Sequence, residues 1–549
     1  MDLDNLFYRN QKQITELVDK FGKRVLTSKE SDSVFHSRYR DFKYSDELAK
    51  IKFDYEPQNT SDFIDEFSSL FENTINFDMP GVMYNIHPNV NIYSQVASFF
   101  SSLANPNFCM DLPSGKLLLI EKAVINYLNQ LAGWDANSSG GIFTFGGKGT
   151  LLYALKVGLS KTIQGSSRRG VWGRNYVISN NLGHPSHIQI CNWLGIGREN
   201  CIRLATYDGI VRVEDIESSF ISIIKQGGRL PLIILNGMTT NNHTFDDVKS
   251  VRAMVDNIVK VYSLDYTPHI HVDSVLGWIY LLLSRYDFNK NPLNICPRVL
   301  SVLKAKTIAS QQIKFADSFA ADFHKTGYCS YVSSVFLVKD KRSLFAIEGK
   351  YSEDENMTFS EYAPYDFTLE SSRSPHGPVS AYSTLKTLGV KGFTKILANH
   401  TEAFFLLKSK FSKTNAIVCN SEENSNLIFL ILKPEKYRDL NIDIDTNQDI
   451  ADEIKDFNTG FYSFLLEKAK KHKIGVFFSC SRSYKYMGKS YGCLKLYNFN
   501  SHFDRKTVEE IYSKIDTLLN EYVRYIGDST GIKNHNFFDY AEIKDVKDV

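Results

Sequence analysis

Four short, unbroken apolar segments constrain the fold of this chain more than any other feature. They lie at residues 176–179, 230–236, 269–275 and 333–338, and most of their residues are valine, isoleucine or leucine. Helical patterns separate them, for example at residues 188–194. Strands that are apolar without alternation are buried on both faces. The sequence therefore predicts an α/β fold with a mostly parallel sheet covered by helices.

The regions on either side of these strands differ in character. Residues 1–80 carry amphipathic helical patterns, the first with apolar residues spaced from Ile14 to Val25. Residues 81–397 hold the apolar strands and form the predicted large domain, and residues 398–549 read as a small α+β C-terminal domain. Because the helical lead cannot form a core alone, we expect it to pack on the rest of the chain or on a second subunit.

Composition excludes several classes of function. The chain has 549 residues, 43% of them hydrophobic, and its formal net charge of +2 does not favour a nucleic-acid partner. Its eight cysteines form no C-x-x-C pair, so we expect reduced thiols and no metal site. No apolar run approaches the roughly 18–20 residues of a membrane span, and the first residues lack the apolar core of a signal peptide. We expect a soluble, cytoplasmic protein.

A lysine stands at the turn that follows the short apolar strand before residue 323. The turn presents His324 and Lys325 side by side, with further apolar residues after it. Loss of water around an ammonium group lowers its pKa and frees the amine to attack a carbonyl. Taken alone, a solvated surface lysine is the simpler interpretation, so the assignment depends on the other residues at strand ends.

A glycine-rich turn at residues 146–149 links a strand to a helix. Glycine lets the backbone approach an anion closely, and the free N–H groups at a helix start point toward it, so the turn is suited to a phosphate. A simple helix N-terminus is the alternative. The turn matches neither the G-x-x-x-x-G-K-[ST] nor the G-x-G-x-x-G pattern.

Polar side chains gather at the predicted carboxyl ends of the strands, where functional groups lie in such folds. They are His184, Thr239, Thr240, Asp273, His324 and Lys325. A pyridine cofactor with a phosphate and an aldehyde requires such a set. A carboxylate pairs with the pyridinium nitrogen, a histidine lies on the ring, and a lysine holds the aldehyde.

Five motifs in a fixed order resemble those of the group II pyridoxal-5′-phosphate-dependent amino acid decarboxylases, which include glutamate, aromatic amino acid, tyrosine and diaminobutyrate decarboxylases. The motifs are the glycine-rich turn, Gly183-His184, His271-Val272-Asp273, Ala316-Asp317-Ser318 with His324-Lys325, and residues 368–373. The resemblance is clear over residues 80–400 and looser in the flanks.

The resemblance implies a fold-type I lyase of amino acid metabolism, a homodimer with its active site at the interface and with residues 1–80 as an exchanged arm. It implies that pyridoxal 5′-phosphate is the cofactor and that the reaction removes the α-carboxylate of an L-amino acid as CO2. Lys325 would be the Schiff-base lysine, Asp273 would pair with the pyridine nitrogen, and His184 would stack on the ring. A loop tyrosine of the family protonates the α-carbon after CO2 leaves; spacing makes Tyr351 the candidate and Tyr362 the runner-up.

The phosphate side departs from the family pattern. The resemblance implies that the phosphate is held by Gly147, Lys148, Gly149 and His324, and that Thr239 or Thr240 lies near the cofactor. Lys148-Gly149 stands where many members have Thr-Glu, so the charge of Lys148 or the hydroxyl of Thr150 would replace the usual hydroxyl. Phe323 stands, after Asp322, where a proline commonly precedes the His-Lys pair.

These residues leave alternatives open. The same anchors serve other pyridoxal reactions, such as oxidative deamination to an aldehyde or carbon–carbon cleavage, which differ in the loop residue that quenches the reaction. A catalytically silent relative that acts as a binding subunit is a third hypothesis. Arg373 is either a clamp for the substrate carboxylate or a structural arginine.

Overall fold

A computed structural model describes residues 11–25, 33–36, 39–53, 55–348, 361–420, 427–442 and 446–528 of the chain. Contacts divide it into two compact units. Unit 1 comprises Met1–Asn85, Leu406–Cys419 and Ile428–Val549, and unit 2 comprises Ile86–Phe405 and Asn420–Leu427. The N-terminal residues thus cluster with the C-terminal part of the chain. No helix within the described ranges is long and apolar enough to cross a bilayer.

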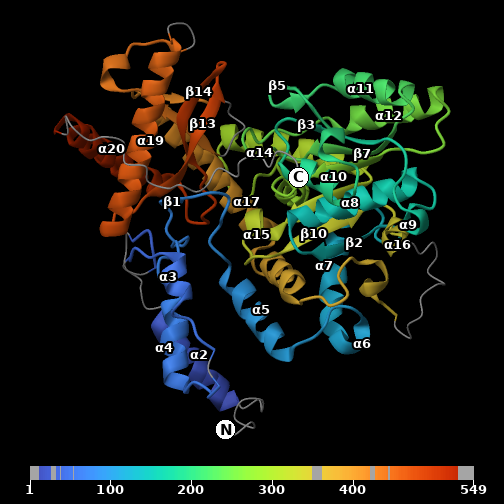
Figure 1. The fold of residues 1–549 in the computed structure, drawn as a ribbon, viewed down its shortest axis with the longest axis horizontal. Coiled ribbons are helices and arrows are strands. Elements are labelled where there is room, and N and C mark those ends of the chain that lie inside the picture. Colours follow the sequence, from blue (N-terminus) through green and yellow to red (C-terminus); the bar gives the residue numbers. More distant parts are fainter. Residues whose placement is uncertain are drawn as a thin grey trace. The chain divides into compact units, whose positions relative to one another are not determined.

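Unit 2 is built on a seven-stranded sheet (Figure 1) with the strand order β2-β10-β9-β8-β7-β3-β4. Its strands are β2 (Gly140–Thr144), β3 (Asn175–Asn180), β4 (Cys201–Leu204), β7 (Arg229–Asn236), β8 (His269–Asp273), β9 (Ser318–Asp322) and β10 (Ser334–Val338). Only β10 pairs antiparallel with its neighbours; the other pairs are parallel, so six strands share one direction. This confirms the predicted α/β class with a mostly parallel sheet.

Helices fill the connections of unit 2, and β5 (Thr206–Tyr207) and β6 (Ile210–Val211) form a separate hairpin. The helices are α5 (Ile92–Ala104), α6 (Asp111–Ser114), α7 (Leu118–Leu131), α8 (Gly147–Thr162), α9 (Ser166–Arg169), α10 (Ser186–Trp193), α11 (Val213–Lys225), α12 (Val248–Val261), α13 (Ile279–Leu282), α14 (Pro297–Ser310), α15 (Phe323–Thr326), α16 (Arg342–Glu348) and α17 (His376–Phe411), whose residues from Leu406 onward belong to unit 1. The last of these has non-helical backbone at Gly389.

Aromatic contacts show that both faces of the large sheet are covered. Phe336 of β10 stacks on Tyr153 of α8, with 5.7 Å between ring centroids. Phe319 of β9 packs on Trp134, just beyond α7, at 5.3 Å. Phe336 pairs across strands with Ala320, which is the neighbour of Phe319. Because successive strand residues point to opposite faces, the two contacts lie on opposite sides of the sheet.

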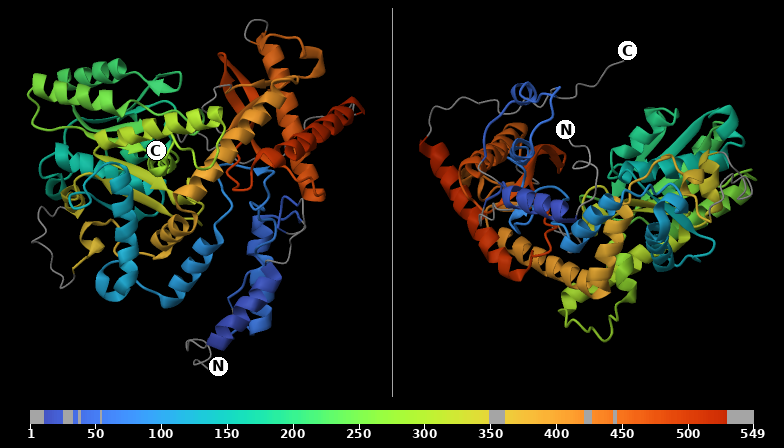
Figure 2. Two further views of the ribbon diagram at one scale, coloured as in Figure 1. Left: turned by 180° about the vertical axis from the view of Figure 1, so that it is seen from behind. Right: turned by 90° about the horizontal axis from the view of Figure 1, so that it is seen from below.

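Unit 1 contains a five-stranded sheet in the order β1-β13-β14-β12-β11. Its strands are β1 (Val82–Met83), β11 (Ala416–Val418), β12 (Ile428–Leu432), β13 (Phe477–Tyr486) and β14 (Lys489–Leu496). Its helices are α2 (Gln11–Val25), α3 (Tyr44–Leu48), α4 (Thr60–Ser69), α19 (Gln448–Lys471) and α20 (Arg505–Asp528). Helix α19 packs on β13 and β14, and α20 packs on α19 (Figure 2).

The N-terminal residues join this unit through β1 and through an aromatic contact. β1 pairs in parallel with β13, at Val82–Phe477 and Met83–Phe478. The ring of Phe35 packs on that of Phe477, with centroids 6.3 Å apart. Phe35 and β1 therefore attach this part of the chain to the unit 1 sheet, and the exchange of residues 1–80 with a second subunit stays a prediction.

Candidate active site

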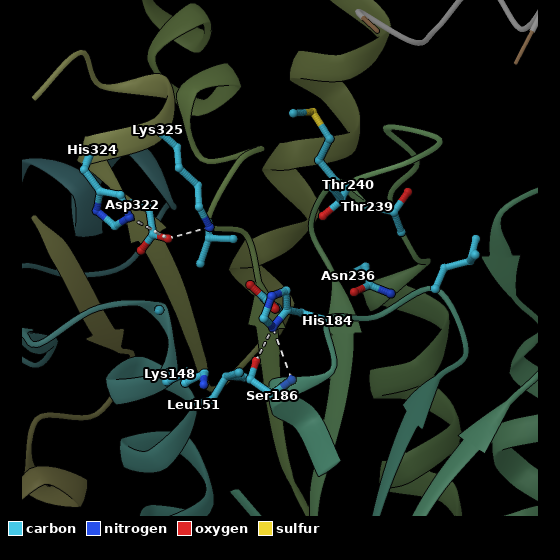
Figure 3. Close-up of a pocket in the computed structure, with 15 residues that line it drawn as sticks. Lys148, Leu151, His184, Ser186, Asn236, Thr239, Thr240, Asp322, His324 and Lys325 are labelled. Carbon is cyan, nitrogen blue, oxygen red and sulfur yellow. Dashed lines mark hydrogen bonds and ion pairs between the residues drawn. The ribbon is translucent and has the colours of Figure 1, made fainter. Parts of the chain in front are cut away.

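A pocket of about 170 Å³ opens at the carboxyl edge of the unit 2 sheet, and residues that end or follow five strands line it. The lining residues that argue for a function are Gly147 and Lys148 after β2, His184 after β3, Asn236, Thr239 and Thr240 at or after β7, Asp273 on β8, and Asp322, His324 and Lys325 at or after β9. The pocket thus brings together eight of the sequence-predicted site residues (Figure 3). The parallel direction of these strands explains why segments far apart in the chain meet here.

Lys325 lies on the single turn α15, directly after β9, and its amine pairs with Asp322. The distance from Lys325 Nζ to Asp322 Oδ2 is 2.7 Å, and the side chains are 23% and 1% exposed. Ser334 Oγ donates to the other carboxylate oxygen at 2.6 Å. Figure 3 shows the lysine side chain directed toward this carboxylate. A half-buried amine is therefore held in one position by a buried anion.

Asp322 is a residue whose role the sequence did not reveal. The sequence pattern marks it only as the residue before Phe323. The Asp-x-x-Lys spacing across a tight turn was the available signal, because residues three apart on one helical turn face each other. A Cβ built on Gly147 would lie 3.2 Å from Asp322 Oδ2, so the carboxylate also approaches the start of α8.

His324 is buried beside the same carboxylate. Its Nε2 lies 3.5 Å from Asp322 Oδ2, and its Nδ1 lies 3.0 Å from the carbonyl oxygen of Ser333. The ring packs on that of Tyr331, with centroids 4.4 Å apart. Burial lowers the pKa of His324 from its ordinary value, which favours the neutral ring. A neutral ring has a single N–H group, so His324 adds no full charge to the pocket.

Asp273 ends β8 and is 7% exposed. Its Oδ2 accepts a hydrogen bond from Nε2 of His187 at 2.9 Å, whereas its buried Oδ1 has no hydrogen-bond partner among the described residues. Burial opposes ionisation, but the hydrogen bond and charge of His187 outweigh it and hold the pKa of Asp273 below its usual range. The pocket therefore contains an anion with one unpartnered oxygen. Sequence reasoning did not single out His187.

His184 is held in the loop between β3 and α10. Its Nδ1 accepts a hydrogen bond from the backbone N–H of Ser186 at 3.2 Å and lies 2.6 Å from the hydroxyl of the same serine. Arg203 donates to the carbonyl oxygens of Gly183 and His184 and so fixes the loop. Burial lowers the pKa of His184, so the ring is neutral at neutral pH. Since Nδ1 accepts, the proton of the neutral ring lies on Nε2.

The start of α8 carries the predicted phosphate turn. Gly147 and Lys148 begin the helix and line the pocket. Because the first N–H groups of a helix have no carbonyl acceptor within that helix, those of Gly147 and Lys148 can bind a phosphate. The Lys148 ammonium lies 5.7 Å from the ring centroid of Trp193.

Two residues of the phosphate prediction lie away from the pocket. The hydroxyl of Thr150 is buried and donates to the carbonyl oxygen of Gly147 at 2.7 Å, so it is used within the helix. Gly149 is buried against Thr144, whose Oγ1 would lie 2.5 Å from an added Cβ. Neither is among the pocket-lining residues, which leaves the helix start and Lys148 as the groups suited to the phosphate.

Thr239 and Thr240 both line the pocket. Thr239 is buried, and its hydroxyl lies 3.0 Å from that of Thr244, which in turn donates to the carbonyl oxygen of Gly209. Thr240 is only partly buried. The structure therefore places both threonines at the site and does not separate their predicted roles.

The tyrosine and arginine predictions fall elsewhere. Tyr351 lies outside the described residues. Tyr362 is not a lining residue; its ring packs against the hydrophobic cluster around Phe108 and under the ammonium of Lys122. Arg373 is buried and pairs with Glu121, and it also donates to the carbonyl oxygens of Phe108 and Phe143. These contacts give Arg373 a structural role.

Comparisons with known proteins point to one family. A sequence model described as "pyridoxal-dependent decarboxylase conserved domain" matches residues 44–433. The acidic amino acid decarboxylase GADL1 of Bos taurus is 26% identical over 295 residues, which are 53% of this chain and 50% of that protein. The chain thus spans about half the length of the curated relatives it matches.

Solved structures share the fold at low sequence identity. The crystal structure of mouse CSAD in apo form is 14% identical, with a TM-score of 0.75 over 93% of this chain and 99% of that chain. The glutamate decarboxylase domain of a Vibrio parahaemolyticus diaminobutyrate-pyruvate transaminase and L-2,4-diaminobutyrate decarboxylase is 16% identical, with a TM-score of 0.72 over 95% and 99%.

Proposed function

Because the chain belongs to the pyridoxal-dependent decarboxylase family, we propose that it removes the α-carboxylate of an L-amino acid as CO2. The observation that carries the proposal is the meeting, in one pocket, of an amine at Lys325, an anion at Asp273 and the N-terminus of α8. Acidic amino acids are the first substrates to test, since the matched curated relative is an acidic amino acid decarboxylase.

The residues present fit pyridoxal 5′-phosphate. Lys325 supplies the amine for the aldehyde, and the unpartnered Oδ1 of Asp273 can accept from a protonated ring nitrogen. The start of α8, at Gly147 and Lys148, offers backbone N–H groups to the phosphate. When bound, this cofactor supplies an electron sink for the electron pair released at the α-carbon of the substrate.

Three side chains of the chain prepare this chemistry. Asp322 holds the Lys325 amine at 2.7 Å and so orients it within the pocket. Asp273 remains an anion and so favours a proton on any basic nitrogen placed against it. His184 is neutral, with a proton on Nε2 that it can donate at the pocket.

A reconstitution experiment tests the proposal. The purified protein is mixed with pyridoxal 5′-phosphate, its visible absorbance is recorded, and CO2 release is measured with aspartate, glutamate, 2,4-diaminobutyrate and aromatic amino acids. We expect a visible band and CO2 from at least one amino acid, with an equimolar amine as product. An aldehyde instead of the amine would favour the aldehyde-synthase alternative. No bound cofactor would contradict the proposal and favour the silent relative.

We also propose that the chain forms a homodimer in the cytoplasm, with helix α5 in the interface. The residues that α5 buries are Ser94, Ser98 and Ser101. Five of its large apolar residues are exposed instead: Ile92, Tyr93, Val96, Phe99 and Phe100. A helix with serines inside and aromatic residues outside is the reverse of a surface helix, and a second copy of the chain would cover the apolar face. The eight free cysteines support a reducing compartment.

Charges placed on this face test the dimer. We expect the double variant Val96→Asp/Phe100→Asp to weaken dimerisation at least about 30-fold, because each change buries an unpaired charge in an apolar contact. The mass in solution is measured by light scattering over a range of concentrations. Val261→Asp, at a 65% exposed valine that ends α12, is the matched control and should leave the mass unchanged. An unchanged mass in the double variant would contradict the proposed interface.

A further inference from the structure

A buried chain of three polar residues runs from β3 to the pocket. Ser179 Oγ lies 2.6 Å from Nδ1 of His187, and Nε2 of His187 lies 2.9 Å from Oδ2 of Asp273. Ser179 is 2% exposed and His187 is fully buried. The three residues come from β3, from the first turn of α10 and from the end of β8.

The hydrogen bonds between Ser179 and His187 and between His187 and Asp273 fix which ring nitrogen of His187 faces the carboxylate. Because Asp273 is an anion, it accepts, so Nε2 of His187 carries a proton. The hydroxyl of Ser179 can donate to Nδ1 of a neutral ring or accept from Nδ1 of a charged one. The hydrogen bond to Asp273 therefore persists whichever state the ring takes, and both ring nitrogens are used.

The surroundings leave His187 little freedom to move. A Cβ on Gly183 would lie 2.6 Å from the Cε1 and Nδ1 atoms of the ring and 3.1 Å from Ser179 Oγ, so the glycine makes room for this contact. The thiols of Cys191 and Cys201 both lie 3.5 Å from the carbonyl oxygen of His187, to which they donate. Backbone and ring are thus both held.

The consequence falls on the second oxygen of Asp273. With Oδ2 bound to His187, the carboxylate cannot rotate without breaking a buried hydrogen bond, which costs free energy in an apolar setting. Oδ1 is left buried and unpartnered on a residue that lines the pocket. An acceptor held in this way is complementary to a single N–H donor.

We propose that His187 is the positioning residue of this site: with Ser179 behind it, it orients Asp273 so that Oδ1 accepts from a protonated ring nitrogen of the cofactor. The inference rests on the proposed function and deepens it, because it assigns a role to Ser179 and His187, which are not among the residues that line the pocket. His187 acts only through Asp273.

The experiment compares two ligands that differ at one atom. Pyridoxal 5′-phosphate has the ring nitrogen, and its 1-deaza analogue has a C–H group there. Equilibrium binding of both is measured by fluorescence quenching, which needs no catalytic turnover. We expect the wild-type chain to prefer pyridoxal 5′-phosphate and His187→Leu to lose roughly 10- to 100-fold of that preference, with the affinity for the analogue unchanged.

Two conservative variants and a control separate positioning from folding. His187→Gln places an amide donor near the position of Nε2 and should restore most of the preference. Ser179→Ala should cause a smaller loss in the same direction, because it removes the partner that sets the tautomer. His269→Gln is the control: His269 is equally buried on β8 but bonds Ser318 and Lys161 and not Asp273, so the preference should not change.

Each outcome decides a separate question. If the His187 variants weaken both ligands equally, or if His187→Gln fails to restore the preference, His187 is merely structural and the inference is overturned. If His269→Gln loses the preference as strongly as His187→Leu, the effect is general and the inference also falls. If the wild-type chain binds neither ligand, the proposed function itself fails.

Discussion

Replacing Lys325 by arginine is expected to lower the rate of CO2 release by at least about 10³-fold. Borohydride reduction should then leave no covalent adduct between the cofactor and the protein. The guanidinium remains protonated and cannot attack an aldehyde, but its charge remains available to the buried carboxylate of Asp322. The fold should therefore survive. The cofactor should still bind through the other contacts and should be removed by dialysis, unlike in the wild-type chain.

Peptide mapping after borohydride reduction checks this result. In the wild-type chain the reduced adduct should fall on Lys325. Lys339→Arg is the matched control, because Lys339 follows β10 on the surface, and it should retain both adduct and activity. An adduct that persists in Lys325→Arg, or activity within tenfold of the wild-type value, would show that another lysine serves the site.

Truncating Arg373 to alanine is expected to lower the free energy of unfolding by about 3–5 kcal/mol. The change leaves Glu121, a fully buried carboxylate, without its ion pair, and it also removes donors from the carbonyl oxygens of Phe108 and Phe143. Glu121 also accepts from the backbone N–H of Phe143, so the pair holds the end of β2 against α7. Equilibrium unfolding in urea measures the loss.

Two comparisons sharpen this experiment. Arg342→Ala breaks an exposed ion pair with Asp340, and its effect should stay within about 1 kcal/mol. The double variant Glu121→Leu/Arg373→Leu removes both charges and should recover part of the loss, since no unpaired charge remains buried. A loss below 1 kcal/mol in Arg373→Ala would contradict the structural role and return Arg373 to consideration as a substrate clamp.

The sequence predicted the sheet well because its strands are continuous apolar runs. The predicted strand at 230–236 is β7, and the one at 176–179 is the centre of β3. The direction of β10 could not be predicted, because an antiparallel strand with both faces buried reads like a parallel one.

The sequence also predicted the site residues that stand at strand ends. It did not predict the residues that hold those side chains in place. Asp273 and Lys325 stand where parallel strands end, so their meeting followed from topology. His187 lies on a helix and points at Asp273, which depends on how α10 packs on the sheet. Thr150 was offered as a phosphate contact, but an early helical threonine can bond its own backbone, and here it does.

The serine-lined interior of α5 has a consequence for the order of assembly. Serines contribute little hydrophobic burial, so this helix gains less from its own subunit than the helices that cover the sheet. The apolar area that would hold it lies on its outer side, at residues such as Phe100. In the proposed dimer, α5 would be a segment whose local stability is set by protomer concentration, so that dilution would loosen it before the sheet.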